Sequence, residues 1–266
     1  MKFVCNTGFL FLLSAVSLTC AMELVSPVEL PHQEIVLGAT ASLNDDIYSG
    51  DADLSGEFSF TPRLSVWGAT SYRFISYQYE FILHDQLHEY VNLQVSGLNA
   101  TYLGFKYFPL DVFGFGTYWR FRSRDGDSKE HFNQIGASLM GLYPFSLRFS
   151  LGASIDALSY FERMNYHPGR ELGGRLSLVW KPAKWEISEV LLYRHRMNES
   201  LNFNMDEPYR KMDDEYSGIK IRASVSRRFG SASAPFYIGI AYEISKGTLF
   251  GFETGHLVKT FVRKAF

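Results

Sequence analysis

The chain has 266 residues, and its 26 lysines and arginines nearly balance its 28 aspartates and glutamates, which gives a formal net charge of −2. This balance argues against a general nucleic-acid binder, because such proteins carry a marked excess of basic residues. Aromatic residues make up 16% of the chain, yet the mean hydropathy is only −0.08. The averages leave the fold class open, since alternating apolar and polar residues cancel in a mean.

The first residues predict export. A basic start is followed by an apolar run over residues 9–16, and Ala21 ends a stretch of small residues that suits signal peptidase. We therefore expect a signal peptide over residues 1–21. The run is too short for a membrane anchor, and acylation of Cys20 is a minor alternative. Both cysteines, Cys5 and Cys20, lie in this leader, so we expect no disulfide and no Cys-ligated metal in the mature chain.

The rest of the chain repeats one pattern, in which apolar and polar residues alternate over segments of about ten residues. The clearest example covers residues 113–123, where Phe115 and Trp119 fall on one face and Arg120 and Arg122 on the other. One face suits lipid and the other suits water. Alternation of this kind is typical of strands that cross a membrane in a barrel.

Twelve such strands are predicted, and short turns alternate with longer polar loops between them. Residues 75–99 are assigned to a loop, although this segment is long enough to hide a further hairpin. In hydrocarbon, an even set of strands satisfies its backbone only if the first strand pairs with the last. The predicted strands cover residues 34–43, 53–60, 64–74, 100–108, 113–123, 132–143, 147–161, 173–180, 185–194, 218–228, 236–245 and 256–266.

The leader, the alternating strands, a set of aromatic residues and the final Phe266 together resemble the bacterial outer-membrane β-barrel superfamily. The resemblance implies an all-β transmembrane antiparallel up-and-down barrel of about twelve strands over residues 22–266, with short periplasmic turns and longer outer loops. It also implies a location in the cell outer membrane. The candidates for an aromatic girdle at the membrane surfaces are Trp67, Trp119, Tyr143, Trp180 and Trp185.

The same resemblance implies partners. In that superfamily a final Phe on an alternating last strand is the signal read by the barrel-assembly machinery, which assigns this role to Phe266. Val258 and Val262 fit the pattern, whereas Lys264 departs from it. Outer-membrane lipid and lipopolysaccharide are the other expected partners, small solutes are possible cargo, and no nucleic acid is expected.

The predicted inward faces carry more basic than acidic side chains. A ring of guanidinium groups would favour anions in a water-filled passage. Alternatively, the same groups stiffen the wall by pairing with interior carboxylates, and the pattern leaves both interpretations open. The predicted inward cations are Arg73, Lys106, Arg120, Arg122, Arg148, Arg175, Lys220 and Arg222, against Glu57, Asp156, Glu186 and Glu243.

No cofactor and no metal site are predicted. His84, Asp85 and His88 are common residue types in a polar loop, as are the acidic pairs at residues 206–207 and 213–214. Motifs for a nucleophile elbow, a zinc protease or a phosphate loop do not occur in the sequence.

An enzyme remains the alternative. Asn44 and Asp45 faintly resemble a pair in the lipid A deacylase barrels, and with Ser49 and His131 they would supply the groups for ester hydrolysis. The same residue types are equally common in turns and would suit the first outer loop. We therefore predict a passive pore for small solutes, with anions favoured if the lumen is open, or a structural surface protein, and keep a lipid hydrolase as the alternative.

Overall fold

The computed structural model describes residues 27–44, 47–83, 87–124, 127–161, 166–167, 169–197, 200–201, 210–211, 216–231, 235–247 and 252–266. The predicted leader lies outside these residues, so cleavage after Ala21 stays a prediction. Within the described ranges, no helix is long and apolar enough to cross a membrane.

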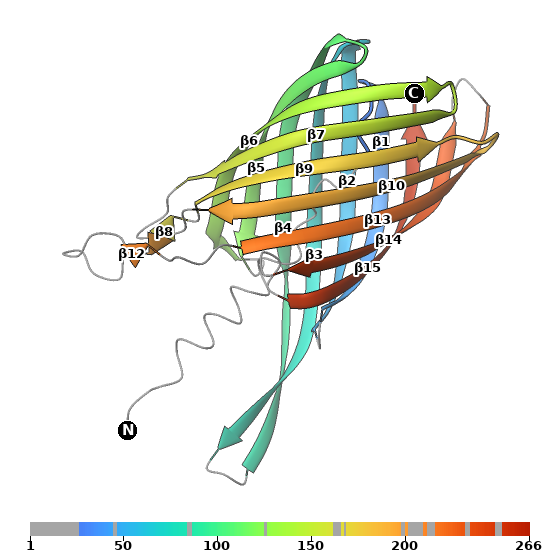
Figure 1. Ribbon diagram of the computed structural model, residues 1–266. Helices are drawn as coiled ribbons and strands as arrows, with labels where there is room; N and C mark the ends of the chain where they lie inside the picture. The colour runs from blue at the N-terminus through green and yellow to red at the C-terminus, as the bar shows by residue number, and fades with distance from the viewer. Residues whose placement is uncertain are drawn as a thin grey trace.

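In the described part of the chain, twelve strands close into one antiparallel barrel (Figure 1). Each strand pairs with its neighbours along the chain, and the barrel closes where Glu34 lies opposite Ala265. This closure confirms the predicted fold class. The strands are β1 (Glu34–Asn44), β2 (Ile47–Thr61), β3 (Leu64–Leu83), β4 (Leu87–Leu110), β5 (Phe113–Arg124), β6 (Asp127–Ser146), β7 (Phe149–Tyr160), β9 (Arg170–Trp180), β10 (Trp185–Met197), β13 (Tyr216–Phe229), β14 (Phe236–Gly247) and β15 (Phe252–Ala265).

Several strands are longer than the sequence predicted. Strands β3 and β4 stay paired as far as Leu83 and Leu87, so residues 75–83 and 87–99 extend these two strands and form neither the predicted loop nor a separate hairpin. Their paired ends project well beyond the rest of the barrel (Figure 1). Three short strands, β8 (Tyr166–His167), β11 (Ser200–Leu201) and β12 (Arg210–Lys211), form a small separate sheet. The polar composition of these regions hid their strand character.

The two ends of the barrel differ. The connections at residues 62–63, 111–112, 147–148, 181–184 and 230–235 all lie at one end, here called the turn end, and the opposite end is called the loop end. Side-chain oxygens help to form two of these turns: Thr61 Oγ1 accepts the backbone N–H of Leu64 at 3.0 Å, and Ser146 Oγ accepts that of Phe149 at 3.1 Å.

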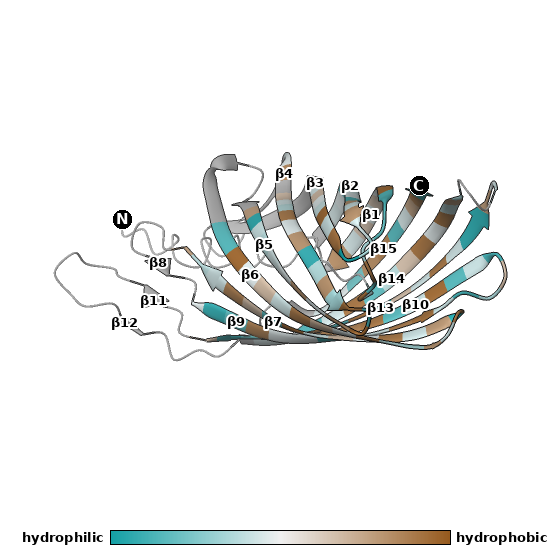
Figure 2. Ribbon diagram, turned by 90° about the horizontal axis from the view of Figure 1, so that it is seen from above, coloured by the Kyte–Doolittle hydropathy of each residue, from teal (hydrophilic) through white to brown (hydrophobic). Residues whose placement is uncertain are grey.

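The outside of the barrel is apolar, and Figure 2 shows apolar and polar residues alternating along the strands. The residues expected to face lipid are all exposed there: Phe113, Phe115, Trp119, Leu176, Leu178, Ile238 and Ile240. Of the girdle candidates, Trp119, Tyr143, Trp180 and Trp185 are also exposed.

The assignment of Trp67 to the girdle was wrong, because this ring packs inside the barrel against Tyr102 and Tyr118. Trp67 and Arg73 lie on one strand and are separated by an even number of positions. They therefore share the inward face.

Candidate functional site

Residues 27–33, here called the plug segment, lie inside the barrel at its turn end, ahead of the first strand. Val28 is 4% exposed and packs with Phe108 and Leu142. Its backbone N–H donates to Ser177 Oγ at 3.0 Å. A Cβ added at Gly152 would lie 2.7 Å from the Cβ of Val28, so a glycine at this point of the wall leaves the room that Val28 occupies. The plug segment thus has a fitted seat.

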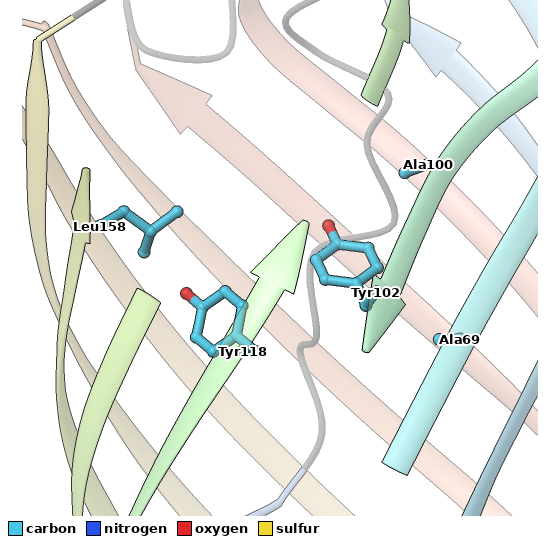
Figure 3. Close-up of a cluster of buried hydrophobic side chains, with 5 residues drawn as sticks. All are labelled: Ala69, Ala100, Tyr102, Tyr118 and Leu158. Atoms are coloured by element: carbon cyan, nitrogen blue, oxygen red, sulfur yellow. The ribbon is translucent and has the colours of Figure 1, made fainter. Parts of the chain in front are cut away.

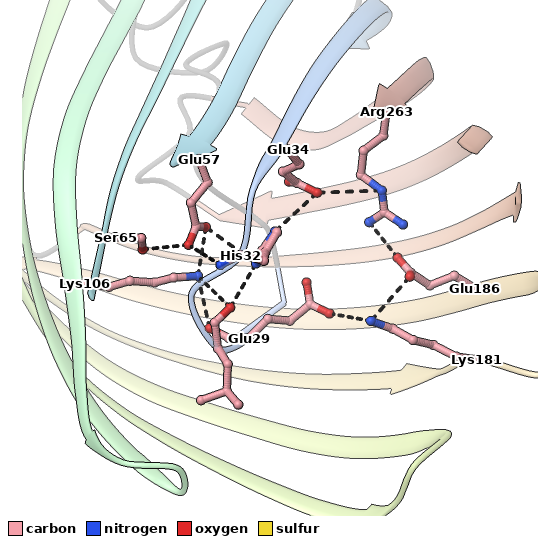
Figure 4. A network of polar contacts seen from close by, with 10 residues as sticks. Glu29, His32, Glu34, Glu57, Ser65, Lys106, Lys181, Glu186 and Arg263 are labelled. Atoms are coloured by element: carbon pink, nitrogen blue, oxygen red, sulfur yellow. Dashed lines mark hydrogen bonds and ion pairs between the residues drawn. The ribbon is translucent and has the colours of Figure 1, made fainter. Parts of the chain in front are cut away.

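Lysines from separate parts of the barrel hold the plug segment (Figure 4). Lys106 Nζ on β4 donates to the carbonyl oxygen of Glu29 at 3.0 Å and lies 2.8 Å from a carboxylate oxygen of Glu57. Lys181 Nζ, in the turn after β9, lies 3.0 Å from the Glu29 carboxylate and 3.4 Å from Glu186. The segment is therefore tied to both sides of the lumen.

Charge on the plug segment strengthens these ties. Burial by itself would lower the pKa of His32, but the hydrogen bond to Glu34 and the charges of Glu34, Glu29 and Glu57 raise the pKa to about 9. Burial by itself would raise the pKa of Glu29, but the charges of Lys181 and His32 hold that pKa at about 2. Both groups are therefore charged at neutral pH.

A second kind of ion pair joins neighbouring strands of the wall. Asp51 on β2 lies directly opposite Arg73 on β3, and two hydrogen bonds of 2.7 and 2.8 Å join them. Asp53 accepts a hydrogen bond from Thr40 at 2.7 Å and lies 2.9 Å from Lys259 Nζ. These wall pairs are buried and linked by charge-assisted hydrogen bonds.

Similar clusters continue around the wall. Glu243 lies 2.7 Å from Arg222 and 3.5 Å from Lys220. Nearer the loop end, Glu171 lies 2.6 Å from Arg196 and accepts a hydrogen bond from the Tyr160 hydroxyl. Charge on the wall is thus closely compensated where these clusters occur.

A cavity of about 160 Å³ lies between the plug segment and the wall. Its apolar side includes Trp67, Tyr102 and Tyr118, and Figure 3 shows the two tyrosines within the buried cluster. The ring centroid of Trp67 is 6.4 Å from that of Tyr102 and 5.9 Å from that of Tyr118. The charged residues that line the cavity are Glu29, Glu34, Glu57, Lys106, Arg120, Arg175 and Arg194.

Most of the predicted inward cations are on the inner wall. Ion pairs or burial place six of them there: Arg73, Lys106, Arg120, Arg175, Lys220 and Arg222. Arg122 lies on β5 opposite Ala100, and its side chain is outside the described residues.

The assignment of Arg148 to the lumen was wrong. Strand β6 runs on to Ser146 and β7 begins only at Phe149, so Arg148 lies in the turn between them and is exposed. Its backbone N–H donates to Ser146 Oγ at 3.2 Å, which belongs to the turn geometry.

Sequence reasoning missed several inner-wall carboxylates, among them Asp51, Asp53 and Glu171. Asp51 and Glu171 were missed because their segments were assigned to loops, whereas Asp53 stood at the start of a predicted strand and was not counted among the inward carboxylates. The signal was present for Asp51, which is separated from the inward Glu57 by an even number of positions on β2. These carboxylates favour paired stiffening as the role of the wall cations outside the cavity.

Phe266, the predicted assembly signal, is exposed at the turn end, and its N–H donates to the carbonyl of Gln33 at 3.1 Å. Val258 and Val262 face outward, as the alternating pattern predicted. Recognition of Phe266 by the assembly machinery stays a prediction.

The groups of the hydrolase alternative are described only in part. Ser49 is buried, and its hydroxyl shares a hydrogen bond of 2.5 Å with that of Ser42. Asp45 and the side chain of His131 lie outside the described residues, as do His84 and Asp85. Among the described side chains, no group of three or more His, Cys, Asp or Glu residues could hold a metal ion. Nothing in the described site favours hydrolysis.

No protein-family model matches the chain, and no curated protein matches it in sequence. Among solved structures, an outer-membrane channel from Pseudomonas putida F1 has a TM-score of 0.61 at 10% identity, covering 93% of this chain and 100% of that one. The NanC porin has a TM-score of 0.51 at 7% identity, and the match covers 87% of this chain and 98% of the porin chain. The translocator domain of the autotransporter NalP from Neisseria meningitidis gives 0.50 at 10% identity, covering 88% of each chain. At these identities the likeness is one of fold.

Proposed function

We propose that this chain, which has the fold of the bacterial outer-membrane β-barrels, is a passive channel for small anionic solutes, restricted at its turn end by the plug segment. The observation that carries the proposal is the charged cavity inside the barrel, between the plug segment and the wall. A barrel with a purely structural role could fill its lumen with side chains instead. The channel would lie in outer-membrane lipid, with the turn end on the periplasmic side.

The preference for anions is inferred from how charge is distributed along the cavity. Arg120 and Arg194 lie toward the loop ends of β5 and β10, whereas Glu34 and Glu57 lie near the turn ends of β1 and β2. A solute that enters from the loop end therefore meets guanidinium groups before carboxylates. Such groups lower the electrostatic barrier for anions.

Ion pairs of the cavity arginines limit this preference but do not remove it. Arg175 lies 3.6 Å from Asp156, and Arg194 lies 3.4 Å from Glu171. Neither carboxylate is among the residues that line the cavity. Among the charged groups of these two pairs, only the arginines line the cavity.

Conduction would require the plug segment to move. It forms no strand with the barrel, and it is held by the seat of Val28 and by the ties of Glu29 and His32. Its departure would leave the ladder of twelve strands intact. The proposal therefore treats the segment as a restriction that can be displaced.

Reversal potentials in planar bilayers under a KCl gradient test the selectivity. We expect anion preference, and we expect Arg120→Glu to shift the reversal potential toward cations, most strongly at low ionic strength where screening is weakest. Arg148→Glu, in an exposed turn, is the matched control and should leave the potential unchanged. Absence of conductance in correctly folded protein, with and without the plug segment, would contradict the proposal.

A further inference from the structure

We infer that the lumen cavity binds a small carboxylate that carries a single ring, such as an aromatic acid or a cyclic sugar acid. The inference rests on the proposed function, because it names the chemical class of the anion that the channel would carry. It follows from three properties of the cavity, which are its size, its aromatic side and its guanidinium groups.

The size of the cavity suits one ring. Its volume is about 160 Å³. An engineered apolar cavity of about 150 Å³ in another protein accommodates benzene, so a six-membered ring with a short polar substituent is the largest rigid ligand expected here. Longer oligomers would need the plug segment to leave first.

The aromatic side is rigidly built. A Cβ added at Gly104 would lie 2.7 Å from the Trp67 ring, and one added at Gly136 would overlap the Tyr118 ring. Each ring therefore lies directly over the backbone of a neighbouring strand at an inward glycine, which fixes its orientation. Tyr102 is 4% exposed and completes the group. Fixed aromatic rings favour contact with another ring by offset stacking or by edge contacts.

The guanidinium groups supply the recognition of charge. Arg120 is 3% exposed, its guanidinium carbon lies 5.2 Å from the centre of the Tyr102 ring, and its Nη1 donates to Gln134 at 3.2 Å. The Tyr102 ring and the Gln134 amide therefore hold this guanidinium beside the aromatic group. Arg175 and Arg194 line the same cavity. A guanidinium fork binds a carboxylate through two parallel hydrogen bonds, which a lysine cannot reproduce.

Calorimetric titration of the full-length protein in detergent tests the inference without requiring conduction. The probes are benzoate and glucuronate, each compared with a neutral ring of similar size, benzyl alcohol and glucose. We expect one-to-one binding of at least one carboxylate, and at least tenfold weaker binding of its neutral counterpart. If only benzoate binds, the ligand is an aromatic acid. If only glucuronate binds, the ligand is a sugar acid. If both bind, the site recognises the ring and the carboxylate that the two probes share.

Two variants locate the binding in this cavity. Arg120→Gln should weaken carboxylate binding about tenfold or more, because a hydrogen bond to a charged group is lost. If that variant does not fold, Ser55→Leu fills the cavity from β2 without removing a cation, and should abolish binding of every probe. Arg148→Gln, in the exposed turn, should bind as the unaltered protein does.

The inference would be overturned if neither carboxylate bound, if the neutral rings bound equally well, or if binding survived Ser55→Leu. Calorimetry and conductance separate the two proposals. If the protein binds a carboxylate but never conducts, the channel is contradicted and the ligand site is supported. If it conducts but binds no carboxylate, the ligand site is contradicted and the channel is supported.

Discussion

The wall of the lumen and the plug segment are held by the same chemistry in two different settings. In the wall, Asp51 and Arg73 sit opposite each other on strands that are already paired through their backbones. In the plug, Glu29 binds Lys181 across a separation of 152 residues, with no strand pairing to support the contact. Ion pairs within a ladder of paired strands therefore stabilise a fixed wall, whereas ion pairs to a segment without strand pairing can break without disrupting the wall.

The largest expected effect concerns a wall pair. Asp51→Ala leaves the buried Arg73 guanidinium without its carboxylate, and loss of one partner of a buried pair costs about 3 to 5 kcal/mol. Glu29→Ala in the plug segment should change the free energy of unfolding of the barrel much less, because Lys181 keeps Glu186 as a partner. Urea unfolding of both variants in detergent micelles measures this. Equal losses would show that the plug segment is part of the wall.

The second prediction concerns the outer face of the wall, where a charged side chain should lower the free energy of unfolding. Ile240→Arg places a charge on the lipid side of β14 and should lower the free energy of unfolding in bilayers by about 2 to 4 kcal/mol. Leu147→Arg, in the exposed turn after β6, is the matched control and should cost little. Equal tolerance at both positions would contradict the assigned facing of β14.

The plug segment, unlike the wall, should respond to mild alkali. The pKa of His32 is raised from 6.5 to about 9, so its stabilising charge is fully present below pH 6.5 and is lost as the pH rises through 9. The groups that face it are Glu29, Glu34 and Glu57. Conductance should therefore rise between pH 6.5 and 9.

The opposite sign holds for Glu29, whose pKa is lowered from 4.5 to about 2. Its contribution is present above pH 4.5 and is lost as the pH falls through 2.

The variant His32→Gln tests the origin of the alkaline rise in conductance, which should disappear in this variant. An unchanged alkaline rise in that variant would exclude His32 as its origin.

The smallest expected effect comes from a single exposed anchor of the plug. Lys181 has a side chain that is 47% exposed, and exposed ion pairs contribute about 1 kcal/mol or less. Lys181→Gln should therefore raise the conductance only slightly. Lys184→Gln, in the same turn, is the matched control. An equal change in conductance in the two variants would show that Lys181 does not anchor the plug segment.

The wall could be predicted from the sequence and the plug could not. Alternation with a period of two is a local property, so all twelve strands and the lipid face followed from short segments. The ends of β3 and β4 were missed because polar residues there pair beyond the barrel rim. Trp67 was misplaced, although its spacing from Arg73 already put it inside.

The plug segment shows no local pattern that would mark it. Its contacts reach residues such as Ser177, which lies 149 positions away from Val28, and only closure of the barrel brings these positions together. The cavity was missed for the same reason, since it exists only between the plug segment and strands from different parts of the chain. Arg148 shows the converse error, because a strand boundary shifted by two residues moved a predicted lumen residue into a turn.

Single-channel conductance in planar bilayers tests the central claim most directly. It compares the unaltered protein with a variant that lacks residues 27–33, and with Gly152→Val, whose side chain would occupy the seat of Val28. We expect both variants to fold as barrels and to conduct more, and more steadily, than the unaltered protein. Equal conductance in all three folded proteins would contradict a plug that restricts the channel.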